Sequence, residues 1–436
     1  MTAIAVLAPP DALPLPVARA GGPRLLAGPR IDGGAEALAA YRARLGRRPI
    51  GGDWMLDVVE RSGLRGRGGA WFPTHRKWRA VNRLAQERGP SVLVVNASEG
   101  EPLSGKDQLL VEKRPHLIID GALIAAESVG ADDVVIYVSR AARRATRALR
   151  HALAERRHDR ISEPRIRIVH TQHRYVAGES SAVVRRVNGG PAKPSFSPPH
   201  PSERGVLGRP TLVQNAETIA HLALIARYGD AWFRERGTDA APGTGMVTLS
   251  GNVARPGVYE VDLGTSLATV IGAAGGALSA PIGLLVGGYF GTWLGPERGA
   301  AATLCPKHVS VGCGVIGMLG RDGCGVGESA RIVSYLARES AGQCGPCVHG
   351  LRAVGEAMTR LAAGDADRGD VIRIHRWSDQ IVGRGACNHP DGAVNNLRTA
   401  LETFAADVER HVSGHPCAGL GTTPLPAPPR SAFGWR

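Results

Sequence analysis

Short apolar runs alternate with helical periodicity along the first half of the chain. The apolar runs cover residues 91–95, 134–138 and 165–169, and the stretches 116–129 and 141–156 between them have the spacing of helices. Strands that alternate with helices form parallel sheets with right-handed crossovers. The pattern therefore predicts an α/β domain with a parallel sheet over residues 46–237.

The segments on either side of these runs have a different character. Residues 1–45 are rich in Ala, Pro and Gly and predict a flexible leader, with order beginning near Trp54. Residues 188–210 carry six prolines and four glycines, which predicts a long loop that covers part of the domain. A helix over residues 215–228 closes the domain, and residues 238–245 form a linker.

The second half of the chain predicts two further units. A hairpin and a helix after residue 245 indicate a small α+β module over residues 245–318. Helical segments follow near 328–340 and 349–363, and the clearest helix spans 392–413, where Val394, Leu397, Leu401, Phe404 and Val408 share one face. Such a face needs partners, so we expect a helical bundle over residues 325–415 and a tail over 416–436.

Composition narrows the functional classes. A chain of 436 residues is long enough for two to four domains, and no apolar run approaches the length of a membrane span. The formal charge of +14 comes mostly from scattered arginine, and only 5% of the residues are aromatic, so we expect no nucleic-acid partner. The proline-studded N-terminus does not resemble a secretion signal, which predicts a cytoplasmic protein.

All seven cysteines lie in the last third of the chain, at positions 305, 313, 324, 344, 347, 387 and 417. Cys344 and Cys347 form a C-x-x-C pair. Cysteines that cluster in a chain without an export signal point to a metal or iron–sulfur module rather than to disulfides.

A glycine-rich loop precedes the first strand. Residues 62–78, SGLRGRGGAWFPTHRKW, place several glycines among basic side chains. Glycines let the backbone approach a phosphate closely, and arginine or lysine supplies the counter-charge. The alternative is an ordinary turn, since the loop matches neither the Walker sequence nor G-x-G-x-x-G in its usual setting.

Acidic residues follow two of the predicted strands. Glu99 and Glu101 lie in the loop NASEGEPLSGKD after the first strand, and Glu179 lies in YVAGESS after the third. Ligands of parallel sheets bind at the carboxyl ends of the strands. These acids suit hydrogen bonds to ribose hydroxyls or to a flavin or nicotinamide edge, and the alternative is that they are solvated loop acids.

Taken in order, the loops resemble one family, the FMN- and NADH-binding flavoprotein subunit of respiratory complex I, over roughly residues 54–413. The matching segments are GLRGRGGA with the Lys-Trp pair at 77–78, NASEGEP at 96–102, YVAGES at 175–180 and GRPTLVQNAET at 208–218. The resemblance implies an α/β FMN-binding domain, a small β-grasp (SLBB-like) module and an iron–sulfur-binding helical bundle. It implies that cofactors are held by Arg65, Gly66, Arg67, Gly68, Gly69, Lys77, Asn96, Glu99, Glu101, Tyr175, Glu179 and Asn215.

Three positions depart from the family pattern near the nicotinamide. Ser98 and Ser180 replace acids, and Trp71 stands where the family uses glycine. The resemblance therefore implies that the FMN contacts are kept and that the NADH side is altered. Trp71 would either supply a stacking surface or block the site.

The cluster motif departs as well. The family sequence S-C-G-x-C-x-P-C is here Ser340 to Cys347 with Ala341 in place of the first cysteine, and Cys387 stands where the remote cysteine is expected. Cys344, Cys347 and Cys387 would thus bind a [4Fe–4S] or incomplete cluster, which normally takes four thiolates. Cys324 and Glu339 are candidates for the fourth ligand, and the alternative is that the thiols are inert and buried.

The expected function follows from this resemblance. NADH would reduce FMN, and electrons would pass singly to an iron–sulfur centre and on to an iron–sulfur partner subunit, a ferredoxin or a membrane-bound quinone-reducing complex. The chain would lie in the cytoplasm and meet the membrane through its partners. The alternative is a degenerate docking or electron-relay subunit that binds flavin and does not oxidise NADH.

Overall fold

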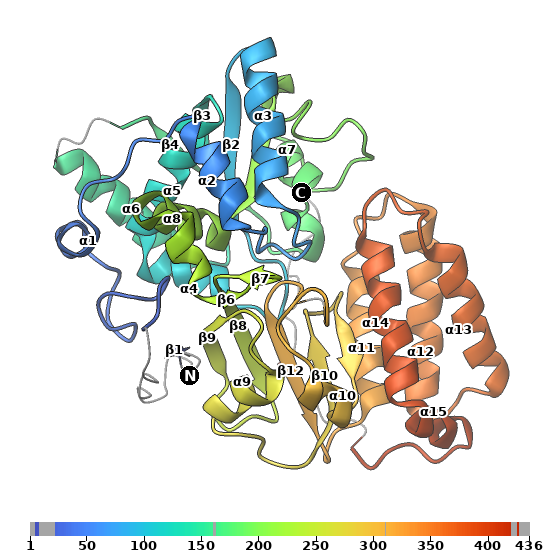
Figure 1. The fold of residues 1–436 in the computed structure, drawn as a ribbon. Coiled ribbons are helices and arrows are strands. Elements are labelled where there is room, and N and C mark those ends of the chain that lie inside the picture. The colour runs from blue at the N-terminus through green and yellow to red at the C-terminus, as the bar shows by residue number, and fades with distance from the viewer. Residues whose placement is uncertain (1–4, 8–21, 160–162, 310, 420–424, 427–436) are drawn as a thin grey trace.

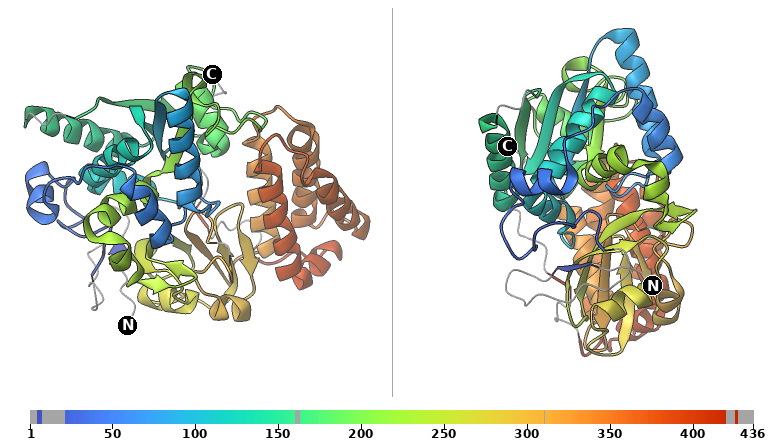
Figure 2. Two further views of the ribbon diagram at one scale, coloured as in Figure 1. Left: turned by 45° about the horizontal axis from the view of Figure 1, so that its top comes forward. Right: turned by 60° about the vertical axis from the view of Figure 1, so that its left-hand side comes forward.

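The computed structural model describes residues 5–7, 22–159, 163–309, 311–419 and 425–426. Three parts follow one another along the chain, an α/β domain, a small β-sheet module and a helical bundle (Figure 1). The bundle stands beside the β-sheet module, and the α/β domain lies across one end of that module (Figure 2). This is the order of parts that the sequence predicts.

The α/β domain is built on a parallel sheet with the strand order β4-β3-β2-β5. Its strands are β2 (Ser91–Ala97), β3 (Ala131–Ser139), β4 (Ile166–Thr171) and β5 (Thr211–Asn215). The first three confirm the predicted apolar runs. The sequence pattern did not predict β5, because the proline-rich stretch before it and the helix after it leave only a short apolar segment.

Seven helices of the described residues pack around this sheet. They are α2 (Trp54–Ser62), α3 (Thr74–Arg88), α4 (Lys106–Lys113), α5 (Pro115–Ser128), α6 (Arg143–His158), α7 (Ser180–Val187) and α8 (Ala216–Arg234). Helix α5 is buried along nearly its whole length and packs against α8. The two backbones approach closely at Gly121, where an added Cβ would lie 2.1 Å from the carbonyl oxygen of Ile219.

The prediction of a flexible leader over residues 1–45 is wrong for residues 22–45, which the structure describes. Leu25 and Leu26 are buried in the core of the α/β domain, and the Glu260 carboxylate accepts their backbone N–H groups at 3.0 Å. Helix α1 (Leu38–Leu45) follows, and strand β1 (Ala5–Leu7) pairs with β9 (Gly257–Asp262). A few apolar anchors hold this segment although its composition is rich in Ala, Pro and Gly. Residues 1–4 and 8–21 of the predicted leader lie outside the described part.

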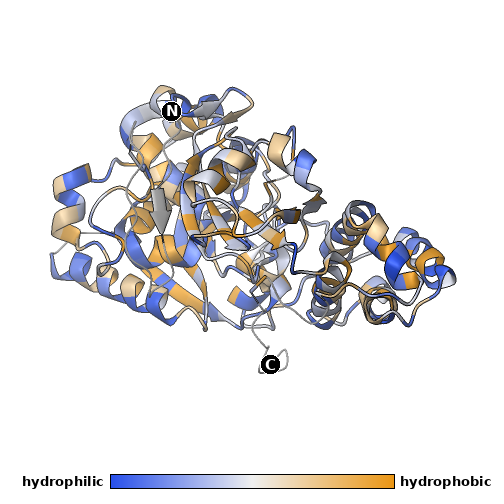
Figure 3. Ribbon diagram, turned by 90° about the horizontal axis from the view of Figure 1, so that it is seen from below, coloured by the Kyte–Doolittle hydropathy of each residue, from blue (hydrophilic) through white to orange (hydrophobic). Residues whose placement is uncertain are grey.

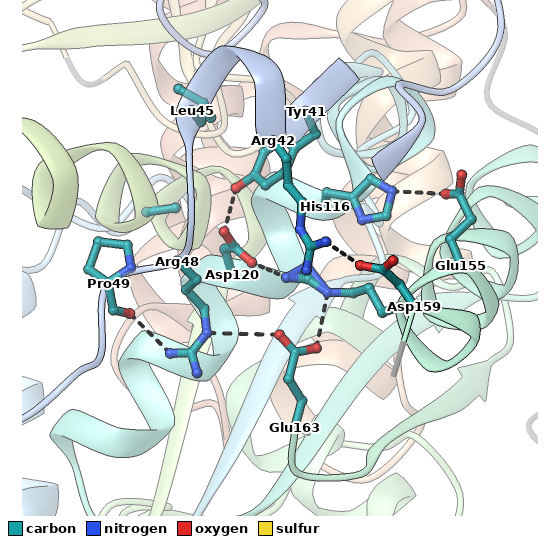
Figure 4. Close-up of polar contacts among 12 residues, drawn as sticks. Tyr41, Arg42, Leu45, Arg48, Pro49, His116, Asp120, Glu155, Asp159 and Glu163 are labelled. Atoms are coloured by element: carbon teal, nitrogen blue, oxygen red, sulfur yellow. Dashed lines mark hydrogen bonds and ion pairs between the residues drawn. The ribbon is translucent and has the colours of Figure 1, made fainter. Parts of the chain in front are cut away.

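A buried ionic network joins α1 to the rest of the domain (Figure 4). The Tyr41 hydroxyl donates to Asp120 Oδ2 at 2.7 Å, and Asp120 also pairs with Arg156 and Arg227. Only 1% of the Asp120 side chain is exposed. Because a buried carboxylate needs charged partners, this cluster fixes α1 against α5, α6 and α8.

The second part is a mixed sheet with the strand order β1-β9-β8-β12-β10-β11. Its elements are β8 (Thr244–Gly251), β9 (Gly257–Asp262), α9 (Leu267–Ala273), β10 (Pro281–Val286), β11 (Thr292–Leu294), α10 (Pro296–Ala301) and β12 (Val315–Gly320). Strands β8 and β9 form the predicted hairpin, and β12 runs parallel to β8. The predicted linker contains a two-stranded ladder of β6 (Gly237–Thr238) and β7 (Ala241–Pro242).

The third part is the predicted helical bundle. It contains α11 (Gly325–Arg338), a π-helical turn (Pro346–Leu351), α12 (Arg352–Ala363), α13 (Arg368–Ile381), α14 (His389–Thr403) and α15 (Ala405–Val412). The single helix expected over 392–413 is wrong, because the chain breaks at Phe404. The Phe404 ring occupies space that glycines leave, since an added Cβ on Gly325 would lie 2.3 Å from it and one on Gly283 2.7 Å.

Hydrophobic and hydrophilic residues alternate around the bundle helices (Figure 3). Within the described residues, no helix has the length and apolar character needed to cross a membrane. After α15 the chain returns to the β-sheet module, where Leu425 is fully buried against Gly251 and Gly317. The rest of the predicted tail, residues 420–424 and 427–436, lies outside the described part.

Candidate functional site

In the α/β sheet, the strands that follow β2 in the chain are added on both sides of it. From β2 the chain adds β3 and β4 on one side and β5 on the other, so β2 and β5 flank a topological switch point. Ligands of open α/β sheets bind at this place, outside the carboxyl ends of the strands. Asn96 and Asn215, the last residues to pair between β2 and β5, face one another there.

The glycine-rich loop between α2 and α3 lies over this switch point. An added Cβ on Gly68 would come within 3.3 Å of Asn215 Cβ, so the loop backbone approaches the start of α8 closely. Gly69 has a φ of +113° with open space around its Cβ position, a conformation that side-chain-bearing residues rarely adopt. Within the loop, Gly66 N–H donates to Phe72 O at 2.9 Å and the Arg65 guanidinium donates to Trp71 O at 3.3 Å.

Lys77 brings a partly buried positive charge to the same edge. Its Nζ donates to Val213 O of β5 at 3.2 Å, and no carboxylate of the described residues forms an ion pair with it. Burial lowers the pKa of Lys77 because the charged form loses its hydration. Thr74 Oγ, in the first turn of α3, is also buried and unpartnered among the described residues. A partly buried ammonium in the first turns of a helix and near a glycine loop suits a phosphate, so these residues fit the phosphate end of FMN.

A buried ionic network lies next to the glycine-rich loop. Lys106 Nζ lies 3.0 Å from Asp107 Oδ1 and 2.8 Å from Glu217 Oε2. Asn215 Nδ2 donates to Asp107 Oδ2 at 2.7 Å, and the Arg67 guanidinium lies 3.7 Å from Glu217. Burial disfavours the charged form of Glu217, but the Lys106 ammonium, a hydrogen bond with His221 and the Arg67 charge together outweigh it and lower the pKa of Glu217 to about 2. The network thus holds the N-terminus of α8 against the glycine loop.

Lys106, Asp107 and Glu217 were not among the residues predicted for the site, although all three lie within its motifs. The signal that could have found them is the Lys-Asp pair at the end of the acidic loop, because buried charges need partners of opposite sign. The Arg67 backbone N–H also donates to Thr218 Oγ at 2.9 Å, in the last quoted motif.

Two of the three predicted acids cap helices. The Glu99 carboxylate accepts the backbone N–H groups of Asp107 at 3.0 Å and Gln108 at 2.9 Å, at the start of α4. The Glu179 carboxylate accepts those of Ser181 at 2.9 Å and Ala182 at 3.1 Å, at the start of α7. These contacts place both acids at the rim of the switch point. Their contact with a nucleotide stays a prediction.

Glu101 lies at the junction of the three parts of the molecule. Its carboxylate accepts the Tyr289 backbone N–H at 2.9 Å and the Tyr175 hydroxyl at 3.1 Å. Burial raises the pKa of Glu101 to about 7. The Tyr175 ring packs edge-on against Phe290 and His389, which come from the β-sheet module and the bundle. Both residues therefore connect the parts of the molecule as well as lining the rim.

The structure also shows the contacts of Trp71 and Ser98, two residues that depart from the family pattern. Trp71 has a left-handed φ of 51°, which explains why glycine suits this position in the family. Its ring packs into the core of the β-sheet module, with Nε1 donating to Gly312 O at 2.7 Å and the Arg67 guanidinium 4.4 Å from the ring centroid. Ser98 is buried and donates to Asn96 Oδ1 at 2.8 Å, and Asn96 in turn donates to Gly178 O at 2.8 Å.

The three predicted cluster cysteines converge at one end of the bundle. Burial, together with the neighbouring Cys344 and Cys387 thiols, raises the pKa of Cys347 to about 12. The Ser340 hydroxyl interacts with Cys347 in the same group, whereas Ala341 brings no donor atom. Three converging thiols fit an iron–sulfur cluster, with the place of the fourth cysteine taken by alanine.

Neither Cys324 nor Glu339, the two predicted candidates for the fourth ligand, is in a position to bind the cluster. Cys324 lies just before the first residue of α11, and the cysteine loop follows the last residue of that helix. The helix has 14 residues. At 1.5 Å per residue, Cys324 and the cysteine loop are therefore about 21 Å apart. The Glu339 carboxylate is buried and accepts hydrogen bonds from Arg174 Nη1 and the Tyr175 N–H, both at 3.0 Å. The prediction of Cys324 as a ligand is wrong, and Glu339 is held by other contacts.

The cysteine loop touches the α/β domain directly. Gln343 Nε2 donates to Pro194 O at 2.7 Å, and Arg185 Nη1 donates to Gln343 Oε1 at 3.2 Å. Burial raises the pKa of Cys387, and the charge of Glu179 is among the further causes, which places this thiol near α7. The cysteine group therefore lies against α7 and the loop that follows α7.

A glycine loop and a partly buried lysine at a switch point, with three thiols close to the same domain, are typical of nucleotide-binding redox proteins of the iron–sulfur class. Comparison with known families agrees. Residues 59–224 match the Nuo51 FMN-binding domain, 246–281 the SLBB domain and 328–411 the NADH-ubiquinone oxidoreductase-F iron-sulfur binding region.

Individual relatives support the same assignment. The chain is 33% identical to the F 2 subunit of the NADH-quinone oxidoreductase of Rhizobium meliloti (strain 1021), over 88% of this chain and 94% of the relative. It is 31% identical to the F subunit of the Streptomyces coelicolor enzyme, over 88% of this chain and 87% of the relative. The chain belongs to the family of NADH-quinone oxidoreductase F subunits, which confirms the resemblance inferred from its loops.

A solved structure shares the fold. An NAD+-reducing [NiFe]-hydrogenase in the air-oxidized state superposes with a TM-score of 0.76 and 32% identity over 83% of this chain. The chain spans 63% of that hydrogenase chain. The predicted α/β FMN-binding domain, SLBB module and iron–sulfur region are thereby confirmed.

Proposed function

We propose that this chain is the NADH-oxidising flavoprotein subunit of a larger redox assembly. The observation that carries the proposal is Lys77, a partly buried lysine with no carboxylate partner among the described residues, which contacts β5 at the switch point near the glycine loop. Bound FMN would supply the chemistry that side chains lack, by taking a hydride from NADH and releasing electrons one at a time.

The residues of the chain would bind and orient the cofactor. Lys77 and the N-terminus of α3 would hold the phosphate, and the backbone of Gly66, Gly68 and Gly69 would let the cofactor approach closely. Arg65 and Arg67 add positive charge to the loop, and Asn96 and Asn215 present amide groups from the two strand ends. No side chain needs to act as a general base, because hydride transfer between bound molecules depends on geometry.

The rim would receive NADH. Glu99, Glu101, Tyr175 and Glu179 surround the carboxyl ends of the strands, and carboxylates accept hydrogen bonds from ribose hydroxyls. The two serines of the rim, Ser98 and Ser180, cannot replace the charge of the acids found in the family. We therefore propose that NADH binds through fewer charged contacts in this chain.

Cys344, Cys347 and Cys387 would bind an iron–sulfur centre that receives the electrons. The cysteine loop contacts the α/β domain through Gln343, so the route between the two sites stays within one chain. We propose that an iron–sulfur partner subunit, a ferredoxin or a quinone-reducing complex accepts the electrons, and that the chain meets any membrane through such partners in the cytoplasm.

The test is reduction of the bound flavin by NADH without oxygen. We expect protein reconstituted with FMN to lose its flavin absorption when NADH is added, as it does with dithionite, which serves as the positive control. Flavin that responds to dithionite and not to NADH would contradict the proposal and support the docking or relay subunit. Protein that takes up no FMN would contradict both functions.

A further inference from the structure

A second group of ligand atoms lies at the opposite end of α11 from the cluster cysteines. Cys324 caps the start of α11, His411 lies on α15, and Cys417 follows the last helix. Their exposed fractions are 3%, 0% and 7%. The two Sγ atoms and one imidazole nitrogen lie within 4.8 Å of one another, so three buried metal-binding side chains from distant elements meet at one point.

The spacing fits a single tetrahedral ion. His411 Nε2 lies 3.4 Å from Cys324 Sγ and 3.2 Å from Cys417 Sγ. Tetrahedral zinc with Zn–S bonds of about 2.3 Å and Zn–N bonds of about 2.1 Å separates sulfur and nitrogen ligands by about 3.6 Å. Both sulfur–nitrogen distances are therefore within a few tenths of an ångström of the tetrahedral value, and the two sulfur atoms lie within 4.8 Å of each other.

The imidazole has the orientation that a metal ligand needs. His411 Nδ1 lies 3.1 Å from Leu361 O and 3.0 Å from Ala362 O, so Nδ1 carries the proton and donates it to these carbonyls. Nε2 then presents its lone pair toward the two thiols. A backbone carbonyl that fixes the far nitrogen is the usual support of a metal-binding histidine.

Both sulfur atoms also have donors that favour the thiolate. The Gly327 N–H donates to Cys324 Sγ at 3.2 Å from the first turn of α11, and Arg410 Nη2 donates to Cys417 Sγ at 2.9 Å. Without a metal, the Cys417 backbone N–H donates to His411 Nε2 at 3.1 Å, and an ion would take over this lone pair. Positive charge and N–H groups around sulfur are typical of metal-binding thiolates.

We propose that Cys324, His411 and Cys417 bind one thiophilic d10 cation, Zn²⁺, with water in the fourth position. The site is separate from the iron–sulfur region, because Cys324 and Cys417 lie outside the matched residues 328–411. The ion would tie the segment after α15 to the start of α11 and so close the bundle at the end away from the cluster. A Cys₂His set of buried ligands suits zinc better than calcium or magnesium, which prefer oxygen.

The experiment measures zinc by mass spectrometry in protein purified without chelator, under argon. We expect about one zinc per chain, lost in Cys417→Ala and kept in Cys305→Ala, a matched control at a buried cysteine of the β-sheet module. Cys344→Ala should also keep its zinc, because it changes only the iron–sulfur group. Cys417 lies beyond the last helix, so its variant is the one expected to fold normally, as circular dichroism would show.

Cobalt provides a second readout in the same protein. Metal-depleted protein with Co²⁺ should develop the absorption bands of tetrahedral cobalt thiolate, and Cys417→Ala should reduce them at least tenfold. Zinc below a tenth of an equivalent together with no cobalt bands would overturn the proposal. A disulfide between Cys324 and Cys417 in protein handled without oxygen, found by peptide mapping, would overturn it as well and assign the pair to redox chemistry.

Discussion

The carboxylate of Glu101 accepts the backbone N–H of Tyr289 at 2.9 Å, and this buried contact joins the α/β domain to the β-sheet module. The same carboxylate accepts the hydroxyl of Tyr175, whose ring packs on the bundle residue His389. One acidic side chain therefore links all three parts of the molecule. Its protonation affects how firmly they are held together.

Glu101 should make the stability of the protein fall as the pH rises from about 5 to 8. Burial raises its pKa from 4.5 to about 7, so in this range the folded state binds a proton that the unfolded state has lost. The stabilisation is complete below 4.5 and disappears as the pH passes 7, a change of about 3 kcal/mol. Melting temperatures across this range should show the decline, and Glu101→Gln should flatten it. Parallel curves for the two proteins would show that Glu101 does not titrate in this way.

Lys77→Met should weaken the binding of FMN. The variant removes the positive charge proposed for the phosphate while keeping an apolar side chain of similar length, and charged hydrogen bonds contribute about 2 kcal/mol or roughly thirtyfold in affinity. Fluorescence titration with FMN measures the change. Lys307→Met, at an exposed lysine of the β-sheet module, is the matched control and should bind FMN as the parent does. Equal affinities in both variants would mean that Lys77 does not meet the phosphate.

Gly68→Val should yield protein that folds and retains little flavin. An added Cβ already lies 3.3 Å from Asn215, and the two methyl groups of valine would extend over the edge where the cofactor is proposed to bind. Gly34→Val is the control, because nothing lies within 4 Å of its Cβ position. The flavin-to-protein absorption ratio after purification gives the answer. A full flavin complement in Gly68→Val would contradict the assignment of the loop.

Ala341→Cys should raise the iron content of anaerobically purified protein. Cys344, Cys347 and Cys387 supply three thiols, and alanine stands where a fourth would complete a four-iron centre. Iron analysis and electron paramagnetic resonance should both change, whereas Ala337→Cys on α11 adds a thiol outside the motif as a control. Cys387→Ala should abolish the signal. Unchanged iron in Ala341→Cys would show that position 341 is not the incomplete corner.

Asp120→Asn should destabilise the α/β domain by about 3–5 kcal/mol, because it leaves Arg227 without a carboxylate partner among the described residues and leaves Arg156 with Glu163 alone. Asp120 pairs with Arg156 and Arg227, and it accepts the Tyr41 hydroxyl, a contact visible in Figure 4. Asp159→Asn removes a half-exposed partner of Arg42 and should cost less than about 1 kcal/mol. Urea unfolding compares the two. Similar losses in both variants would mean that the network is not the main support of α1.

The sequence predicted the order of the three parts because apolar runs and helical spacing are local properties. It missed β5 and the ordering of residues 22–45, since both depend on partners far along the chain. Leu25, for example, is held by the carboxylate of Glu260. Nothing in the local pattern around Leu25 predicts that contact.

The candidate site also contains some residues that could be predicted from the local sequence and others that could not. The glycine loop, Lys77 and the cysteines could be found because their residue types and spacing suit one chemistry. The roles of Glu101 and Trp71 could not, because each depends on a residue of another part of the molecule, the N–H of Tyr289 and the carbonyl of Gly312. The group of Cys324, His411 and Cys417 was missed because its members are scattered in sequence and meet only through the bundle.

The close approach of the α5 and α8 backbones at Gly121 changes how substitutions at this position should be interpreted. The carbonyl of Ile219 that faces Gly121 lies one helical turn from Asn215, so the missing side chain of one helix sets the position of the other helix at the site. Any larger residue at 121 would push α8 away from the glycine loop. In a genetic screen, such a substitution would be scored as a defect in cofactor binding, although position 121 never meets the cofactor.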